Sequence, residues 1–467
     1  MTTHPLSRTL RRREVLRWLA AAPAATVVAS CAPRVVKETV EKPVKETIVV
    51  RETVIAEPTA SYEQGELKML GCCFSPQSYE IAQAFNTRFE AAHPGAKLTL
   101  DLLPAGQNYF EKLQTLFAAG TAPDVFDMWE GYVQPYAANG ALLKMDPFLE
   151  MDPKIKKEDI LPAVWEGGSW QNSLYALIFG FIPGPVSLYF NVDHFDQAGL
   201  DYPTSDWLWD NVRDAAQVLT TQASGSAVPE RWGLAFDLWF VPWLYWIWSN
   251  GGDVFNEDET HCTLTDAKCV EALQYWADMV NVDKSAATGS TLQSLQGALN
   301  AFMTGAVSMY LGNAWDVSTL MPNKDLKWKA VLSPKANNGN RVWYMHSHCW
   351  SIAATTKMPR LAWEYVRDFT LEVEPSKEWQ EANPEIPGLR QLLYAFATPT
   401  ASALGYDPLI ALVGQPGVLR VPGAGDKWDK ISGIIQAELD LAFIGDKTVA
   451  EAAAAAAPQV DEELSAS

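Results

Sequence analysis

From about residue 67 onward, two patterns of hydrophobic and polar residues follow each other in turn along the chain. Short apolar runs are typical of buried strands, whereas apolar residues three and four positions apart are typical of amphipathic helices. The predicted strands span residues 67–71, 98–103 and 124–128. The predicted helices between them span residues 80–93 and 109–119. This alternation predicts an α/β lobe in which helices pack on a sheet.

Length and composition extend this prediction to more than one folding unit. The chain has 467 residues, and a single core rarely grows beyond roughly 250–300 residues. The net charge of −20 would repel a phosphate backbone, so no nucleic-acid partner is expected. Nineteen tryptophans, seven of them between Trp207 and Trp248, offer flat apolar faces of the kind that stack on sugars.

The first 30 residues have the order of a signal peptide. Five arginines precede a weakly apolar run at residues 18–29, which is too short to span a hydrocarbon layer of ~30 Å. Arg12 and Arg13, with the four residues that follow, resemble the twin-arginine export motif, which a receptor reads. A general secretory signal with additional arginines is the alternative. Residues 1–30 are therefore predicted to be an export signal.

Cys31 is the predicted site of lipid attachment. Val28-Ala29-Ser30-Cys31 resembles a bacterial lipobox, in which cleavage precedes the cysteine and lipid is joined to its thiol. Each buried CH₂ of an acyl chain contributes ~0.8 kcal/mol, so this lipid would hold the protein on a membrane. Residues 31–65 repeat short charged and valine-rich units and predict an extended tether, with a span of about 30 Å if it is flexible.

The five other cysteines are expected to meet an oxidising compartment. Cys262 and Cys269 flank a short segment and form a candidate disulfide. Cys72 and Cys73 are adjacent, and because adjacent cysteines bridge only with strain, buried free thiols are expected there. Near Cys349, His346 and His348 would share one side of a strand while the thiol faces away, so no metal site is predicted. No cofactor is expected either.

Four segments resemble, in the same order, motifs of the family 1 extracellular solute-binding proteins, the group that includes maltose-binding protein. The first, Gly120-Thr121-Ala122-Pro123-Asp124-Val125, is similar to G-x-x-P-D-[VI] of that family. The other three segments lie at residues 174–200, 302–315 and 351–366. The resemblance covers most of residues 66–460, and although each motif alone is weak, four in the family order are specific.

The resemblance implies an α/β, two-lobe periplasmic-binding-protein-like fold (type II), with a ligand cleft between lobes joined by hinge strands. By this analogy residues 66–182 and 313–372 form the first lobe. Residues 187–308 and 373–460 form the second lobe, and 461–467 form a tail. The implied function is that of the extracytoplasmic, membrane-anchored substrate-binding subunit of an ABC importer. Its expected partners are a carbohydrate ligand and the transmembrane subunits of the permease, and the protein itself is expected to be a monomer.

Aromatic and polar residues near the expected cleft are the candidate ligand contacts. The resemblance, together with their positions after or on predicted strands, singles out Trp129, Glu130, Trp239, Trp243, Trp315, His348 and Trp350. No enzymatic activity is expected. Two alternatives stay open: a secreted glycoside hydrolase, which would need two carboxylates roughly 5–10 Å apart, and the same fold binding a polyamine, glycerol phosphate or iron.

Overall fold

The structure is a computed structural model that describes residues 63–72, 74–103, 109–222, 225, 228–383, 385–406, 408–413, 415 and 417–466. These described residues belong to one compact unit, Tyr62–Ser467. The predicted export signal, the lipid site at Cys31 and almost all of the predicted tether lie outside the described residues. In the described part of the chain, no helix has both the length and the apolar character needed to cross a membrane.

The larger sheet of the unit Tyr62–Ser467 has the described strand order β12-β6-β11-β3-β1-β2, with β13 paired to β11. Strand β1 is parallel to β2 and β3, whereas β11 is antiparallel to β3 and β6. The strands are β1 (Gly65–Cys72), β2 (Ala96–Leu103), β3 (Val125–Met128), β6 (Ala176–Gly184), β11 (Trp343–Ile352), β12 (Ile386–Pro387) and β13 (Leu419–Arg420). The three strands predicted from the apolar runs are confirmed as β1, β2 and β3.

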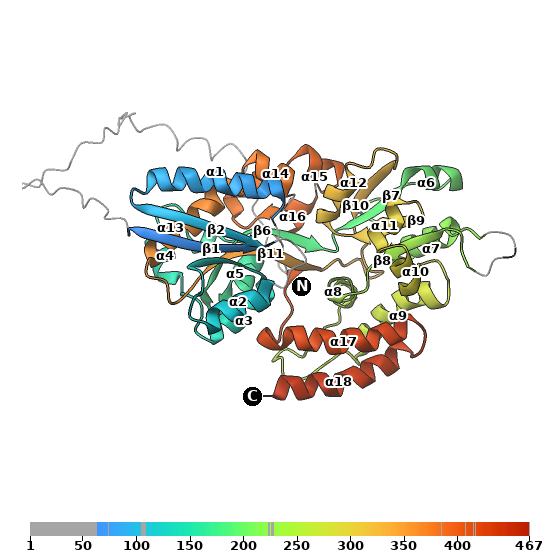
Figure 1. The fold of residues 1–467 in the computed structure, drawn as a ribbon. Helices are drawn as coiled ribbons and strands as arrows, with labels where there is room; N and C mark the ends of the chain where they lie inside the picture. Colours follow the sequence, from blue (N-terminus) through green and yellow to red (C-terminus); the bar gives the residue numbers. More distant parts are fainter. Residues whose placement is uncertain are drawn as a thin grey trace, which may run out of the picture. The chain divides into compact units, whose positions relative to one another are not determined.

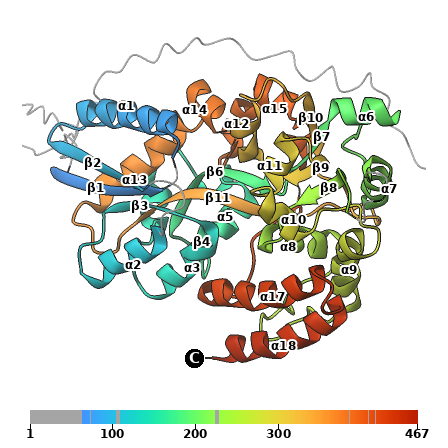
Figure 2. The same ribbon diagram turned by 45° about the vertical axis from the view of Figure 1, so that its right-hand side comes forward.

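Helices cover both faces of this sheet, and we call the sheet with these helices the first lobe. Helices α1 and α14 lie on one side and α2 and α3 on the other (Figures 1 and 2). The helices are α1 (Pro76–Ala92), α2 (Tyr109–Ala118), α3 (Glu130–Ala138), α13 (Pro359–Asp368), the π-helix η4 (Phe369–Val373) and α14 (Lys377–Ala382). Helix α1 begins at Pro76 because Ser75 Oγ accepts the N–H of Ser78 at 3.1 Å and caps the first turn. Both predicted helices are confirmed, as α1 and α2.

A second sheet, with the described order β10-β7-β9-β8, forms the second lobe together with its own helices. The strands are β7 (Ser187–Asn191), β8 (Trp232–Phe236), β9 (Val307–Gly312) and β10 (Trp328–Leu332). The helices are α6 (Val192–Ala198), α7 (Trp209–Leu219), α8 (Phe240–Ser249), α9 (Ala267–Asn281), α11 (Ala298–Met303), α17 (Trp428–Phe443) and α18 (Val449–Ser465). Helices α17 and α18 lie side by side and pack against α9 (Figure 2).

Short elements complete the described part of the chain. The α-helices among them are α4 (Asp146–Met151), α5 (Pro162–Gly167), α10 (Gly289–Ser294), α12 (Val317–Leu320), α15 (Pro399–Ala403) and α16 (Leu409–Val413). The others are the hairpin strands β4 (Ser169–Trp170) and β5 (Ser173–Leu174) and the 3₁₀ turns η2 (Lys157–Asp159), η3 (Ala314–Asp316), η5 (Arg390–Phe396) and η6 (Gly425–Lys427).

The sheets differ from the predicted lobe boundaries at three strands. Strand β10 was expected in the first lobe with residues 313–372, but it pairs antiparallel with β7 in the second sheet. Strands β12 and β13 were expected in the second lobe with residues 373–460, but they pair with β6 and β11 of the first sheet. These pairings join segments far apart in the sequence, so the lobe that receives each strand is set by tertiary structure. The chain therefore passes from the first sheet to the second between β6 and β7 and returns between β10 and β11, and after β13 it continues into α17 and α18 of the second lobe.

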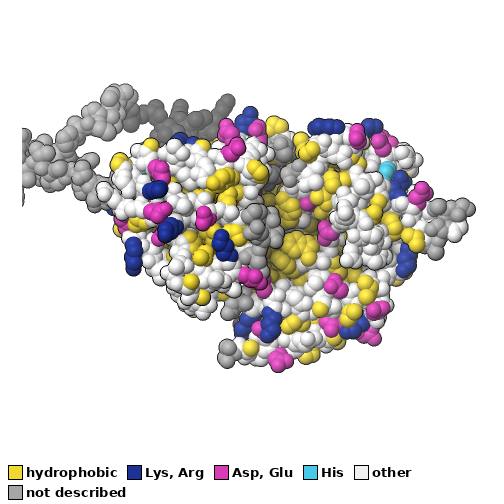
Figure 3. Space-filling model, viewed as in Figure 1, with side chains coloured by type: hydrophobic (Ala, Val, Ile, Leu, Met, Phe, Trp, Pro, Cys, Tyr) yellow, Lys and Arg dark blue, Asp and Glu magenta, His cyan; other side chains and the backbone are white. Residues whose placement is uncertain are grey.

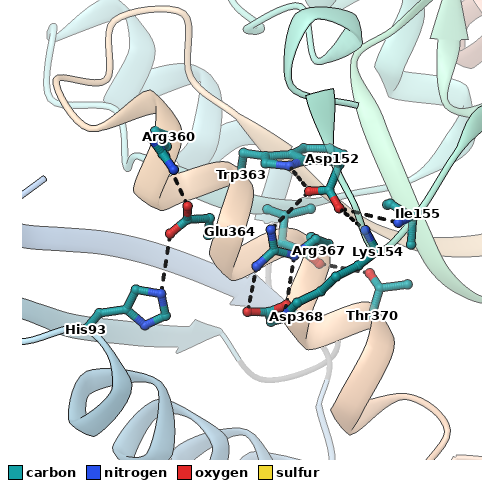
Figure 4. A network of polar contacts seen from close by, with 11 residues as sticks. His93, Asp152, Lys154, Ile155, Arg360, Trp363, Glu364, Arg367, Asp368 and Thr370 are labelled. Atoms are coloured by element: carbon teal, nitrogen blue, oxygen red, sulfur yellow. Dashed lines mark hydrogen bonds and ion pairs between the residues drawn. The ribbon is translucent and has the colours of Figure 1, made fainter. Parts of the chain in front are cut away.

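A buried polar network fixes α13 to the segment that follows α4 (Figure 4). Arg367 donates to Asp152 Oδ2 at 3.0 Å and, through two nitrogens, to both oxygens of Asp368 at 2.8 Å. Lys154 Nζ adds a bond of 2.7 Å to Asp368. Trp363 Nε1 adds one of 2.8 Å to Asp152. All donors of this network come from the first lobe, so it stabilises that lobe and lies apart from the site described next.

Candidate functional site

The candidate site lies along β11, the strand between β6 and β3 in the first sheet. Side chains at alternate positions of a strand share one face, which here groups Tyr344, His346 and His348. Helix α8 of the second lobe packs against β11. Figure 3 shows hydrophobic side chains lining a hollow in the region where Figure 1 draws β11. The site therefore combines parts of both lobes.

His346 is the meeting point of two tryptophans from different lobes. The ring of Trp129 lies 5.6 Å from the ring of His346, edge to face at 65°. The ring of Trp315 lies at the same distance, at 68°. Trp129 directly follows β3 of the first sheet, and Trp315 lies in η3, just after β9 of the second sheet. Both indoles are half-buried, so part of each ring remains accessible.

Trp239 joins the same group through two intermediate rings. Trp239 contacts Phe240 at 4.9 Å, Phe240 contacts Tyr344 at 5.4 Å, and Tyr344 lies 6.4 Å from His346. We call the set Trp129, Trp239, Phe240, Trp315, Tyr344 and His346 the aromatic cluster. The structure thus brings together three of the predicted tryptophans in one continuous group.

Glu130 lies beside the cluster, but its carboxylate is engaged inside the protein. Ser347 donates its N–H and its hydroxyl to Glu130 Oε2 at 2.7 and 2.6 Å, and the Tyr344 hydroxyl donates to Oε1. His346 Nδ1 lies 3.7 Å from Oε1, and the Glu130 side chain has no exposed surface. Burial raises the pKa of Glu130, but the hydrogen bond and charge of His346 and the hydrogen bonds from Ser347 and Tyr344 lower it by more. The net pKa lies below the usual value for glutamate, so the carboxylate is ionised. The predicted direct contact of Glu130 with a ligand is therefore not supported by its position.

His348 lies between two carboxylates at the floor of the site. Its Nδ1 is 3.3 Å from Asp127 Oδ2, and its Nε2 is 3.9 Å from Glu385 Oε1. Gly180 faces His348 on β6, and the Glu385 carboxylate occupies the space that a side chain at Gly180 would fill. Burial lowers the pKa of His348, but the negative charge of Asp127, followed by those of Glu385 and Glu130, raises the pKa to about 9. With 17% of its side chain exposed, His348 remains a candidate ligand contact.

The raised pKa of His348 predicts a pH-dependent contribution to stability. A histidine with a folded pKa of about 9 stabilises the protein fully below its unfolded pKa of 6.5, and this contribution is lost as pH rises through 9. The difference in the free energy of unfolding between the unaltered protein and His348→Gln is therefore expected to depend on pH. This difference should be larger at pH 7 than at pH 10 by roughly 2–3 kcal/mol.

Urea unfolding of both proteins at the two pH values measures this difference. His194→Gln is the matched control: burial lowers the pKa of His194 to about 4, so His194 is neutral throughout that interval and no such change is expected. An equal gap for His348→Gln at both pH values would contradict a charged His348.

Trp243 and Trp350 are core residues, which corrects their assignment as ligand contacts. Both are 0% exposed. Trp243 packs on Trp428 and donates its indole N–H to Gln436 Oε1 at 3.1 Å. Trp350 is enclosed by the rings of Phe74, Phe179, Tyr365 and Phe369. No face of either indole is available for a ligand.

The cysteines differ from expectation at two places. Cys262 and Cys269 are free thiols, and Cys269 Sγ donates to the carbonyl of Asp253 at 3.0 Å, so the predicted bridge is not formed. Cys72 was expected to be a free thiol but is disulfide-bonded. Cys349 is a buried free thiol that donates to the carbonyl of Met128. Among the described residues, no group of three or more His, Cys, Asp or Glu side chains has the geometry to hold a metal ion.

Sequence reasoning missed several members of the site. His346 was considered only as a metal ligand, yet its alternate spacing with His348 places both rings on the same face of β11. Phe240 and Tyr344 gave no local signal, because their contact joins α8 to β11 across the lobes. Tyr132 in α3 was also missed; its hydroxyl donates to Asp429 Oδ2 in α17 at 2.6 Å and links the two lobes at one end of the site.

The chain belongs to a known family. Residues 75–370 match the bacterial extracellular solute-binding protein family, and this stretch is more than half of the chain. A protein of Brucella abortus that is named as a binding protein is 24% identical over 336 residues, covering 69% of this chain and 74% of its own length. The members of the family and these relatives are binding proteins, and the family name places its members outside the cytoplasm.

Solved structures of similar fold include a substrate-binding protein in complex with a ligand and a protein named as sugar-binding. The ABC substrate-binding protein Lmo0181 of Listeria monocytogenes, in complex with cycloalternan, superposes with a TM-score of 0.72 at 22% identity, covering 86% of this chain and 99% of its own. The sugar-binding protein MalE of Xanthomonas citri gives a TM-score of 0.70 at 16% identity, covering 86% and 97%. These matches confirm the predicted two-lobe α/β fold.

Proposed function

We propose that this protein is the substrate-binding subunit of an ABC importer and binds a carbohydrate between its two lobes. The observation that carries the proposal is the aromatic cluster, in which Trp129 of the first lobe and Trp315 of the second lobe meet at His346. Half-buried indoles offer flat apolar faces, which match the apolar face of a sugar ring. The cycloalternan in the complex of one protein of the same fold, and the name of another as a sugar-binding protein, agree with this assignment.

Binding from both lobes gives a physical reason for closure. A ligand shifts the balance between open and closed forms only by its difference in affinity for them. A sugar that touches Trp129 and Trp315 makes both contacts only when the lobes are close, so it favours the closed form. The strands that connect the sheets would act as the hinge. The closed form would then be the one that the permease subunits recognise.

The anchoring of the protein is a further part of the proposal. The lipobox at residues 28–31 supports a lipid on Cys31, and the paired arginines Arg12 and Arg13 support export by the twin-arginine route. A tether of residues 31–65 would let a monomeric binding unit move above the outer face of the membrane while remaining attached. Metabolic labelling with a radioactive fatty acid, compared between the protein and Cys31→Ser, tests the anchor; equal labelling would contradict it.

Replacing Trp315 by alanine is expected to weaken ligand binding by about 1–3 kcal/mol, because it removes a stacking face. The melting temperature of the ligand-free protein should change little, because the Trp315 indole is only half-buried. Calorimetric titration with the bound sugar and a thermal melt without it measure the two effects. A large loss of stability without loss of affinity would instead make Trp315 a structural residue.

A thermal-shift screen against a carbohydrate panel tests the proposed function itself. Stabilisation that rises with ligand concentration is expected for at least one sugar. Stabilisation by spermidine or glycerol phosphate and by no sugar would contradict the proposal. So would the release of reducing ends from an oligosaccharide, which would indicate a hydrolase.

A further inference from the structure

A side-chain hydrogen bond joins the two lobes beside the candidate site. Tyr132 in α3 of the first lobe donates its hydroxyl to Asp429 Oδ2 in α17 of the second lobe at 2.6 Å. The beginning of α17 lies next to α3 in both ribbon views (Figures 1 and 2), and the turn η6 that precedes α17 packs against α3. Because the two residues belong to different lobes, this bond requires the lobes to be close together.

The Tyr132 ring is held in place by other rings of the first lobe. It stacks on Phe110 of α2, with 3.5 Å between the ring centroids and 7° between the ring planes. Phe110 in turn contacts Trp129 edge to face at 4.9 Å. The ring contacts that surround a tryptophan of the aromatic cluster therefore also orient Tyr132, and its hydroxyl is already in position when the second lobe approaches.

Asp429 is held in place by the second lobe. It lies in the first turn of α17, where the positive end of the helix dipole favours a carboxylate. Trp428, the residue directly before it, is 4% exposed and packs on Trp243. Trp428 also contacts Phe240 of the aromatic cluster at 5.9 Å. Each partner of the hydrogen bond is thus fixed to its own lobe, next to a ring of the aromatic cluster.

The hydroxyl of Tyr132 remains a hydrogen-bond donor at neutral pH. Burial raises the pKa of Tyr132, and the hydrogen bond to Asp429 and the charge of that carboxylate raise the pKa further. A hydrogen bond to a carboxylate is stronger than one between neutral groups. Asp429 is exposed, however, so water competes for its oxygens. The bond is therefore strong enough to bias the positions of the lobes without locking them.

The interface around this bond is incompletely packed. A cavity of about 330 Å³ lies beside the bond and is lined by Tyr132, Tyr136, Gln114 and Asp429, among other residues. The free energy of separating two surfaces rises with the apolar area that is newly exposed to water. Separation of the lobes at this point exposes little such area, so the contact can form and break as the lobes move.

We propose that Tyr132 and Asp429 form a clasp that stabilises the closed arrangement of the lobes before a ligand is bound, and that the clasp raises ligand affinity without touching the ligand. The effect on affinity rests on the proposed function, in which closure accompanies binding. A protein whose binding-competent form is more populated binds its ligand more tightly. The clasp would therefore set the affinity of the site separately from the tryptophans that contact the ligand.

Distances between the lobes in the ligand-free protein test the clasp. Spin labels are attached through a keto-bearing unnatural amino acid at two exposed positions, Lys112 of α2 and Gln459 of α18, so that no cysteine is labelled. Pulsed electron paramagnetic resonance then gives the populations of molecules with short and long distances. Tyr132→Phe keeps the ring and removes only the hydroxyl. We expect this variant to lower the ratio of closed to open molecules at least threefold.

Tyr202→Phe is the matched control. Tyr202 donates its hydroxyl to Asp196 Oδ1 at the same distance of 2.6 Å, but both residues lie in the second lobe, so the ratio should not change. Asp429→Ala is expected to reproduce the effect of Tyr132→Phe. The double variant should add little to either single variant, because both substitutions remove the same bond.

A ratio that Tyr132→Phe leaves unchanged would overturn the clasp, and so would an equal decrease in Tyr202→Phe. Neither result would bear on the proposed function, which the carbohydrate panel tests separately. If no sugar in that panel stabilised the protein while its lobes still responded to Tyr132→Phe, the proposed function would be contradicted and the clasp would stand.

Discussion

Replacing Arg367 by methionine is expected to lower the free energy of unfolding by about 3–5 kcal/mol, since it leaves buried carboxylates uncompensated. Arg367 is 8% exposed and supplies three hydrogen bonds to Asp152 and Asp368, which are themselves buried. Methionine matches the length of the side chain but offers no donor. Without it, Asp152 keeps only Trp363 and backbone N–H donors, and Asp368 keeps Lys154.

Arg360→Met is the matched control for this prediction. Arg360 lies on the same helix and pairs with Glu364, but 60% of its side chain is exposed. An exposed pair of this kind contributes about 0–1 kcal/mol, so the control should unfold close to the unaltered protein in urea. Similar midpoints for both variants would show that the buried network (Figure 4) adds no stability.

Replacing Trp243 by alanine is expected to lower the free energy of unfolding by about 3–5 kcal/mol, because it leaves a large cavity in the core. The indole is 0% exposed, packs on Trp428 and donates to Gln436, so its loss removes packing and also leaves an amide oxygen without its donor. Urea unfolding monitored by circular dichroism measures the loss. The effect is structural, and it contrasts with the binding effect expected at Trp315.

Trp239→Ala, four residues earlier, provides the comparison for Trp243→Ala. Trp239 is half-buried at the start of α8 and belongs to the aromatic cluster. Trp239→Ala should lower the free energy of unfolding less than Trp243→Ala does. It should weaken ligand binding more than Trp243→Ala does. If Trp243→Ala instead weakened binding without loss of stability, the core assignment of Trp243 would be wrong.

Local sequence patterns predicted the first lobe well because its strands and helices follow each other closely. The apolar runs that became β1, β2 and β3 are separated by helices with clear amphipathic spacing. Strands β10, β12 and β13 could not be placed in the same way. Two of them are only two residues long, and each pairs with a strand far away in the sequence. Their positions depend on how the completed sheets meet, which no local pattern encodes.

The tryptophans show where prediction of the site failed. Residue type suggested that Trp239, Trp243, Trp315 and Trp350 could all stack on a ligand, but type does not distinguish a cleft from a core. One signal was available for Trp243. Residues 240–248 carry no charged side chain, and a helix that is apolar all round is expected to be buried. For Trp350 there was none, since the ring is covered by Tyr365 of α13 and Phe369 of η4, which follow β11 in the chain.

The place of β11 in the first sheet has a consequence for how the protein is made. This strand lies between β6 and β3, yet it begins only at residue 343. Until the ribosome has added those residues, β3 and β6 each expose an edge with unpaired backbone groups, which can pair with other chains. The sheet that begins first along the chain is therefore among the last parts to be completed. A chain interrupted before residue 343 lacks the centre of its first lobe, and such fragments are expected to aggregate.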